Sequence, residues 1–149
     1  MLPCERVNLD VRVDTWQEAV RECGKLLLKA DAITPDYIDA MIRTAEDFGP
    51  YYVIAEGIAM PHASPESGAK KTALSLVRLS NPIEFGNPDN DPVRLVFGLT
   101  AVDHTNHIQA LQVLAELIMN KEKMSQIFTL KDAKSVCEVI SQFEMSQHE

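Results

Sequence analysis

The residues in this sequence that are best suited to chemistry are its histidines, and the chain has four of them. His62 stands in the stretch EGIAMPHASP, after three apolar residues and a proline. His104 and His107 stand in AVDHTNHIQAL, where a β-rich segment gives way to a helical pattern, and His148 lies in the C-terminal tail. Because the ordinary pKa of histidine is about 6.5, an uncharged ring near neutral pH offers a nucleophilic nitrogen.

Phosphoryl transfer is the chemistry that a lone, uncharged imidazole can perform without further groups. Nitrogen bound to phosphorus keeps the phosphoryl group transferable, whereas a serine or threonine ester is chemically stable. A histidine can therefore accept a phosphoryl group from one donor and pass it on as a covalent intermediate. The pattern favours His62 as the acceptor, with His107 beside the phosphoryl group and no metal or catalytic triad.

Other interpretations of these histidines stay open at this point. A single histidine after a strand is often a hydrogen-bonded structural residue, His107 could be an ordinary helix-start residue, and His104 a solvated loop residue. A zinc site from Asp103, His104, His107 and His62 is conceivable, since zinc accepts nitrogen and oxygen ligands. No spacing such as His-Glu-x-x-His is present, so a metal-dependent hydrolase is a remote alternative.

Few other residues are candidates for this site. Lys70 and Lys71 could add positive potential at its edge, or they could simply belong to a solvated loop. Cys4, Cys23 and Cys137 are an odd count without short paired spacing, which predicts neither a disulfide framework nor a zinc knuckle. None of the three cysteines is a good catalytic candidate.

Composition limits the class of protein. With 149 residues, the chain predicts one domain over residues 1–149 with a real core. The net charge of −8 argues against nucleic-acid binding, which depends on lysine and arginine, and it suits an encounter with a basic protein surface. The sequence shows neither a membrane-spanning run nor a signal peptide, so we expect a cytoplasmic protein without direct membrane insertion.

The elements that would position the histidines follow from periodicity and caps. Alternation over residues 7–13 predicts a strand, and the capping box Thr15 to Glu18 begins a helix that ends near Ala30. Thr34 and Pro35 begin a second helix, which Gly49 closes. Apolar spacing predicts helices again from Thr105, around Met124 and from Ala133 onward. The strands expected between these helices are residues 51–54, 58–60, 72–79 and 93–102, with a loop over 80–92 that holds a short edge strand at 83–85.

This order of elements predicts an α/β sandwich, a single mixed sheet with helices on its faces, although the strand order cannot be read from the pattern. His62 would follow a buried strand that Pro61 ends, since proline cannot donate to a ladder. His107 would lie in the first turn of a helix starting near Thr105, where free N–H groups favour an anion.

Two long stretches resemble a known family. Both are similar to the type-2 IIA components of the bacterial sugar phosphotransferase system (PTS), which form the fructose/mannitol superfamily. The two stretches are GPYYVIAEGIAMPHASPESGAKKTALSLV and NDPVRLVFGLTAVDHTNHIQALQVLAEL. The segment around His62 resembles the phosphorylation-site motif of that family, and the segment around His107 resembles its second active-site histidine motif. The resemblance covers nearly the whole chain and is strongest to the ascorbate-type proteins and a cryptic mannitol-related branch.

The resemblance implies a cytoplasmic phosphocarrier with a helix-flanked mixed sheet and no cofactor. His62 would accept phosphoryl from the phosphocarrier HPr and pass it to a cysteine of the IIB component, which serves a membrane IIC component. His107 would steady the transferring group without being phosphorylated. The attacking atom would be Nε2 of His62, with Nδ1 held by a backbone carbonyl.

The chain departs from the family pattern at two places. Mannitol-type members carry an arginine upstream of the site histidine, and here Arg43 is out of register, so no role is assigned to it. His104 stands where the family has no histidine. A regulatory relative of the nitrogen type, which acts by phosphorylation-dependent protein binding, is the alternative function.

Overall fold

A five-stranded mixed sheet forms the centre of the protein, seen in a computed structural model that describes residues 6–49 and 53–147. Its strands are β1 (Val7–Val11), β2 (Val53–Ala55), β3 (Ile58–Ala59), β4 (Ala73–Ile83) and β5 (Val93–Thr100). They lie in the order β1-β4-β5-β3-β2. The pairs β1/β4 and β3/β5 are parallel, and the pairs β4/β5 and β2/β3 are antiparallel.

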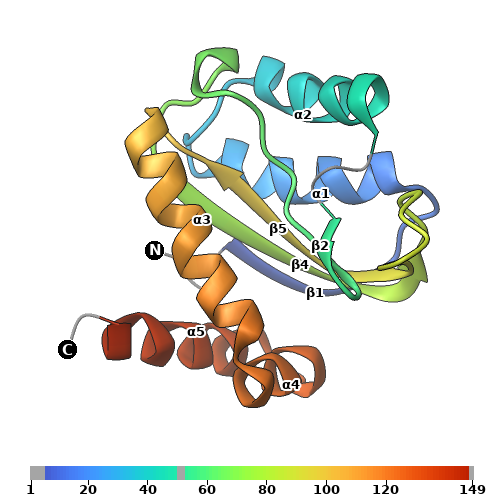
Figure 1. The fold of residues 1–149 in the computed structure, drawn as a ribbon, viewed down its shortest axis with the longest axis vertical. Coiled ribbons are helices and arrows are strands. Elements are labelled where there is room, and N and C mark those ends of the chain that lie inside the picture. Colours follow the sequence, from blue (N-terminus) through green and yellow to red (C-terminus); the bar gives the residue numbers. More distant parts are fainter. Residues whose placement is uncertain (1–5, 50–52, 148–149) are drawn as a thin grey trace.

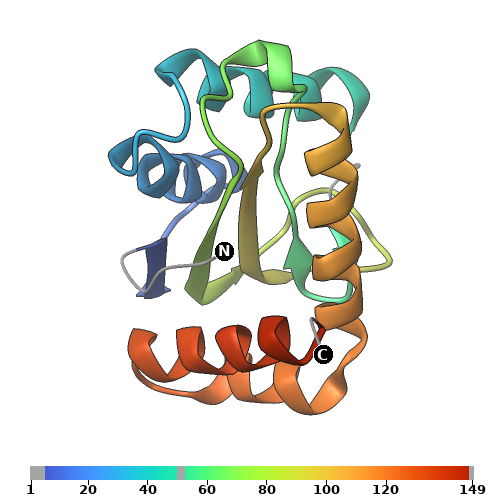
Figure 2. The ribbon, with the colours of Figure 1, turned by 90° about the vertical axis from the view of Figure 1, so that its left-hand side faces the viewer.

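Helices cover both faces of this sheet (Figure 1). Along the described chain they are α1 (Trp16–Lys29), α2 (Pro35–Phe48), the short 3-10 helix η2 (Pro65–Ser67), α3 (His104–Met119), α4 (Lys121–Thr129) and α5 (Ala133–Gln147). Figure 1 shows α1 and α2 on one side of the strands and α4 and α5 on the other, and Figure 2 shows the same arrangement after a turn of 90°. None of the helices described here combines the length and the apolar character needed to cross a bilayer.

The two N-terminal helices begin and end as their sequence predicts. The Thr15 side chain accepts the N–H of Glu18 at 3.2 Å, and the Glu18 carboxylate accepts the N–H of Asp14 at 2.9 Å. Pro35 opens α2, and Gly49 ends it with a φ of 85°, a conformation that glycine adopts without strain. Both predicted helices and the N-cap at Thr15 are confirmed. The Glu18 side chain bonds the N–H of Asp14, one residue before the N-cap, so only the Thr15 half of the predicted capping box is formed.

Buried side chains form two apolar clusters, one on each face of the sheet. One cluster lies under α1 and α2, and the other lies against α3, α4 and α5. The inner strand β4 supplies residues to both clusters, because successive side chains of a strand point to opposite faces. Ala73 and Val77 belong to the first cluster, and Leu74 and Leu76 to the second. The predicted α/β sandwich with a mixed sheet is confirmed.

The strand boundaries differ from the prediction at the end of β4. This strand runs to Ile83 rather than Leu79, so the separate strand predicted at 83–85 is wrong, as is the start of the predicted loop. Pro82 is tolerated there because the register between β4 and β5 shifts between Arg78 and Ile83, where the ladder is interrupted. β5 ends at Thr100, two residues earlier than predicted.

The cysteines are only partly as predicted. Cys23 and Cys137 are both buried, Cys23 as a free thiol. Cys137 is disulfide-bonded, which the cysteine count and spacing did not predict. Burial raises the pKa of the Cys23 thiol to about 12, so a nucleophilic thiolate does not form there near neutral pH. Cys4 and residues 51–52 lie outside the described residues.

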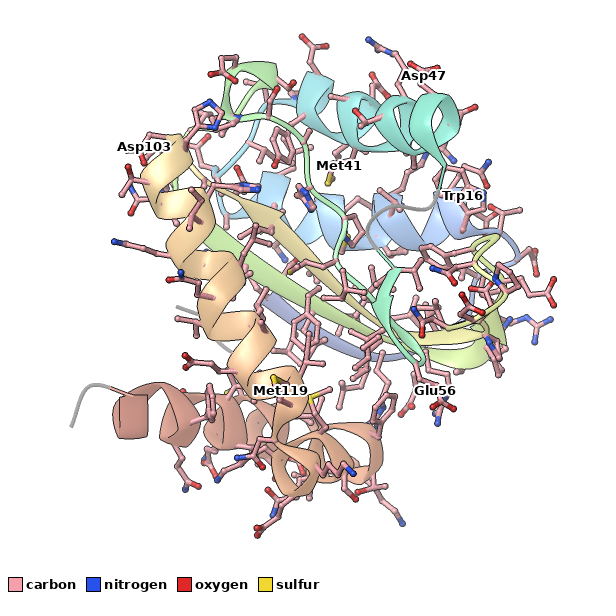
Figure 3. All side chains as sticks on the ribbon, in the orientation of Figure 1. Trp16, Met41, Asp47, Glu56, Asp103 and Met119 are labelled. Carbon is pink, nitrogen blue, oxygen red and sulfur yellow. The ribbon has the colours of Figure 1, made fainter. Side chains whose placement is uncertain are left out.

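α3, the helix that carries His107, starts at His104 because Asp103 supplies its N-cap. Oδ1 of Asp103 accepts the backbone N–H of Asn106 at 2.8 Å, and both carboxylate oxygens accept the Asn106 side-chain amide at 3.0 Å. The helix therefore starts one residue before the predicted position, and its N-terminus already holds a carboxylate. Figure 3 shows Asp103 at this end of α3 and Met119 near the other end.

Removing this cap tests what fixes the start of α3. We expect Asp103→Ala to lower the free energy of unfolding by about 1 kcal/mol, the usual effect of losing an N-cap acceptor. Asp103→Asn is the matched control, since asparagine caps helices about as well as aspartate does. Urea denaturation followed by circular dichroism measures both variants. An alanine variant as stable as the natural protein, or an asparagine variant as unstable as the alanine one, contradicts this account.

Candidate functional site

His62 lies where the chain leaves β3 and continues beside β5. The β3/β5 register places Ala59 opposite Val96, and the N–H of Leu99 still donates to the carbonyl of Pro61 at 3.0 Å. Ala59 belongs to the cluster under α1 and α2, whereas Met60 belongs to the cluster against α3. Continued alternation along the chain turns His62 toward the α3 face.

His107 approaches the same place from the first turns of α3. Its backbone N–H donates to the carbonyl of Asp103 at 3.0 Å, so it is a regular helical residue and not an open N-terminal donor. The ring centroids of His62 and His107 are 5.0 Å apart, and the ring planes meet at 60°. Both residues are half-buried. The structure therefore brings together two histidines that lie far apart in the sequence.

One hydrogen bond decides the chemistry of the His62 ring. Nδ1 of His62 lies 2.8 Å from the carbonyl oxygen of Met60. A carbonyl oxygen can only accept, so Nδ1 must carry a proton, and in the neutral ring the lone pair then lies on Nε2. This is the backbone contact that the family resemblance implies.

The surroundings keep both rings uncharged near neutral pH. Burial lowers the pKa of His62; the Met60 carbonyl partly opposes this, and the nearby His107 lowers the pKa further. The pKa of His107 is also lowered, first by burial and then by the charge of His104. A neutral ring is the nucleophilic form, so the site favours phosphoryl acceptance without a separate base.

His104 lies at the edge of the site and makes a different contact. It is the first residue of α3, its side chain is 73% exposed, and its Nε2 is 3.3 Å from a carboxylate oxygen of Glu66. Glu66 belongs to η2, so the pair joins the segment after His62 to the start of α3. The structure places His104 on a helix rather than in a loop.

The lysines considered for the site face elsewhere. Lys70 forms an ion pair with Asp31, and Nζ of Lys71 lies 3.4 Å from the carbonyl oxygen of Ala30. Both contacts are to the turn between α1 and α2. Arg43 is an exposed residue of α2.

A metal site is not formed by the histidines as the structure places them. No group of three or more histidine, cysteine, aspartate or glutamate side chains in the described residues could hold a metal ion. The Asp103 carboxylate accepts hydrogen bonds from Asn106, in its role as the N-cap of α3.

One residue beside the site was not identified from the sequence. The hydroxyl of Tyr37 accepts the N–H of Ala63, the residue after His62, at 3.0 Å, and lies 2.8 Å from the carbonyl oxygen of Leu99. Tyr37 stands four positions before Met41 on the buried face of α2, and a tyrosine at such a position needs a polar partner. The need of a buried tyrosine hydroxyl for a polar partner is the feature of the sequence that could have identified Tyr37.

Solved structures of one class of protein share this fold. The mannitol-specific cryptic phosphotransferase enzyme IIA CmtB from Escherichia coli matches with a TM-score of 0.86 and 37% identity, over 95% of both chains. Enzyme IIA of the mannitol system from Escherichia coli, solved in complex with phosphorylated enzyme IIB, matches with a TM-score of 0.83 and 25% identity, over 95% of this chain and 99% of that one.

Relatives found by sequence comparison show which family within this class the chain belongs to. The ascorbate-specific PTS system EIIA component of Escherichia coli strain K12 is 39% identical over 135 residues, which is 90% of this chain and 88% of the relative. Residues 1–143 match the family described as phosphoenolpyruvate-dependent sugar phosphotransferase system, EIIA 2. The chain belongs to this family and is a IIA phosphocarrier of the phosphotransferase system, of the ascorbate type.

The lowered histidine pKa values predict how stability depends on pH. Between the lowered values and the ordinary pKa of about 6.5, the unfolded chain binds more protons than the folded chain, so stability falls as pH falls through this window. We expect His62→Gln, which cannot be protonated, to lose less unfolding free energy than the natural protein between about pH 7.5 and about pH 5. Urea denaturation at each pH measures this difference. Equal losses in the two proteins contradict a lowered pKa for His62.

Proposed function

We propose that His62 is the phosphorylation site, that it accepts phosphoryl from phospho-HPr, and that it passes the group to a cysteine of a IIB component. The cargo of the system would be ascorbate or a related sugar or polyol, taken up through a membrane IIC component while this protein works in the cytoplasm. The proposal rests mainly on one arrangement, a half-buried His62 ring whose Nδ1 is bonded to Met60 and whose neighbour at 5.0 Å is His107.

In the first step, the lone pair on Nε2 of His62 forms a bond to phosphorus. The nitrogen–phosphorus bond of the donor phosphohistidine breaks, and the donor ring keeps that electron pair. The proton on Nδ1 of His62 stays in place, so no base has to remove it. Positive charge that develops on the His62 ring strengthens the hydrogen bond to the Met60 carbonyl, at 2.8 Å.

The second step is the same displacement in the opposite direction. A thiolate sulfur of the IIB component attacks phosphorus, the bond from phosphorus to Nε2 breaks, and the His62 ring regains its lone pair. The ring is then ready for another cycle with its Nδ1 proton unchanged. Both steps balance without a metal ion or a cofactor.

His107 supports the transfer as a hydrogen-bond donor. Its Nδ1 is buried without a hydrogen-bond partner among the described residues, so a proton there would be an unsatisfied donor. In the neutral ring the proton is therefore more stable on Nε2, which can donate to an oxygen of the transferring phosphoryl group. Such positioned donors stabilise the charge that spreads over these oxygens in the transition state.

The surface of the protein and a solved complex of a related protein support HPr and a IIB component as partners. The mannitol IIA enzyme, which has the same fold, has been solved in complex with phosphorylated IIB. Here the net charge of −8 favours a basic partner surface. Val102 and Ile108 lie on either side of His107 in the sequence and are 46% and 55% exposed, so they would offer apolar contact to a partner. An ascorbate or related cargo is supported by the ascorbate-specific relative.

Phosphoryl labelling tests this proposal directly. We expect incubation with phosphoenolpyruvate, enzyme I and HPr to give one phosphoryl adduct that is stable in base and labile in acid. His62→Ala should abolish the adduct, and intact-protein mass spectrometry measures it. His104→Gln is the matched control, because it removes an exposed histidine whose Nε2 contacts Glu66. A His62→Ala protein that labels like the natural one ends the proposal.

The same assay, followed by rapid quenching, measures the contribution of His107. His107→Gln should still be labelled, but about 100-fold more slowly, which is the usual effect of losing one donor to a transition-state oxyanion. Transfer at the natural rate removes the proposed role of His107 and leaves that of His62 unaffected.

A further inference from the structure

A buried phenol connects α2 to the chain segment that carries His62. Tyr37 is fully buried, and its hydroxyl oxygen accepts the N–H of Ala63 at 3.0 Å. The hydroxyl has one proton to donate, and the carbonyl of Leu99 at 2.8 Å is nearer than that of Ala63 at 3.2 Å. The phenol therefore joins the residue after His62 to β5. Burial raises the pKa of Tyr37, which keeps this proton in place.

The register of the sheet explains where this hydroxyl lies. β3 is parallel to β5, with Ala59 opposite Val96. Three residues further along both chains, the same register places His62 opposite Leu99. The N–H of Leu99 donates to the carbonyl of Pro61 at 3.0 Å, which is the bond that a parallel pair forms on the N-terminal side of such a residue.

On the C-terminal side of His62, the Tyr37 hydroxyl replaces the direct hydrogen bond between Ala63 and Leu99. In a regular parallel pair, the N–H of Ala63 would donate directly to the carbonyl of Leu99. Here the Tyr37 hydroxyl stands between them, with one bond of 3.0 Å and one of 2.8 Å. A direct bond would span about 2.9 Å between nitrogen and oxygen. The chain after His62 is thus held away from β5 by one oxygen atom.

We propose that Tyr37 is a positioning residue for phosphoryl transfer, because its hydroxyl acts as a spacer in the β3/β5 ladder and thereby sets the place of the His62 ring. Pro61 is fixed directly to Leu99 and Ala63 is fixed through the phenol, so His62 lies between two anchors of unequal length. The inference rests on the proposed function of His62 as the phosphoryl acceptor.

Displacement of the ring would act on the reaction rather than on partner binding. Tyr37 is 0% exposed, so a protein partner cannot touch it. The hydrogen bond from Nδ1 of His62 to Met60 and the 5.0 Å approach to His107 both depend on where the chain around His62 lies. Transfer reactions lose about 100-fold in rate when reacting groups are misplaced by about 1 Å.

Tyr37→Phe is the decisive variant, because it keeps the ring and removes the spacer. We expect the maximal rate of phosphoryl transfer from HPr to fall about 10- to 100-fold, while the KM for phospho-HPr stays within about twofold. The nitrogen-15 shifts of the unphosphorylated His62 ring should also move, which reports the ring directly and needs no phosphoryl donor. If His62 is never phosphorylated, the proposed function fails while this NMR readout still tests the spacer.

Ser75→Ala is the matched control for lost stability. Ser75 is also fully buried, and its hydroxyl donates to the carbonyl of Cys23 at 2.9 Å on the same face of the sheet. We expect this variant to be destabilised but to keep the natural transfer rate and His62 nitrogen shifts. A Tyr37→Phe protein with natural rate and shifts, or a Ser75→Ala protein with the same changes as Tyr37→Phe, overturns the inference.

Amide hydrogen exchange on the natural protein tests the spacer even if Tyr37→Phe does not fold. The N–H of Ala63 should be protected to the same degree as the N–H of Leu99, since both are anchored between the same two chains. An Ala63 amide that exchanges like an open loop amide means that the phenol does not hold this segment, and overturns the inference.

Discussion

The hydrogen bond between Nδ1 of His62 and the carbonyl oxygen of Met60 is the interaction on which the site depends. It fixes the proton on one nitrogen and leaves the lone pair on the other, while burial keeps the ring uncharged. A serine or a protonated histidine would need a base to become a nucleophile. Here a backbone carbonyl two residues away prepares the ring, which would let His62 act as the proposed phosphoryl acceptor without a separate base.

The sheet supplies the precision of this arrangement. β3 ends beside β5, and alternation along the chain turns His62 to the face where α3 carries His107. A loop between elements would leave the ring free to move. By continuing the β3/β5 register past Pro61, the chain gives His62 the rigidity of a strand while leaving it half-buried at the end of that strand.

Most helices and strands could be predicted from the sequence because the residues that start and end them lie close together in the chain. The N-cap at Thr15 and the proline and glycine around α2 all act within a few residues. The distance between His62 and His107 and the inserted hydroxyl of Tyr37 depend on strand order, which pairs β3 with a strand far along the chain. The extension of β4 through Pro82 was missed because a register shift with β5 makes proline acceptable there.

The most direct measurement is NMR of the phosphorylated protein labelled with nitrogen-15, in which phosphorus–nitrogen coupling identifies the bonded atom. We expect coupling to Nε2 of His62, with Nδ1 of the same ring still protonated and hydrogen-bonded. Coupling to Nδ1 of His62, or to a nitrogen of any other histidine, contradicts this expectation.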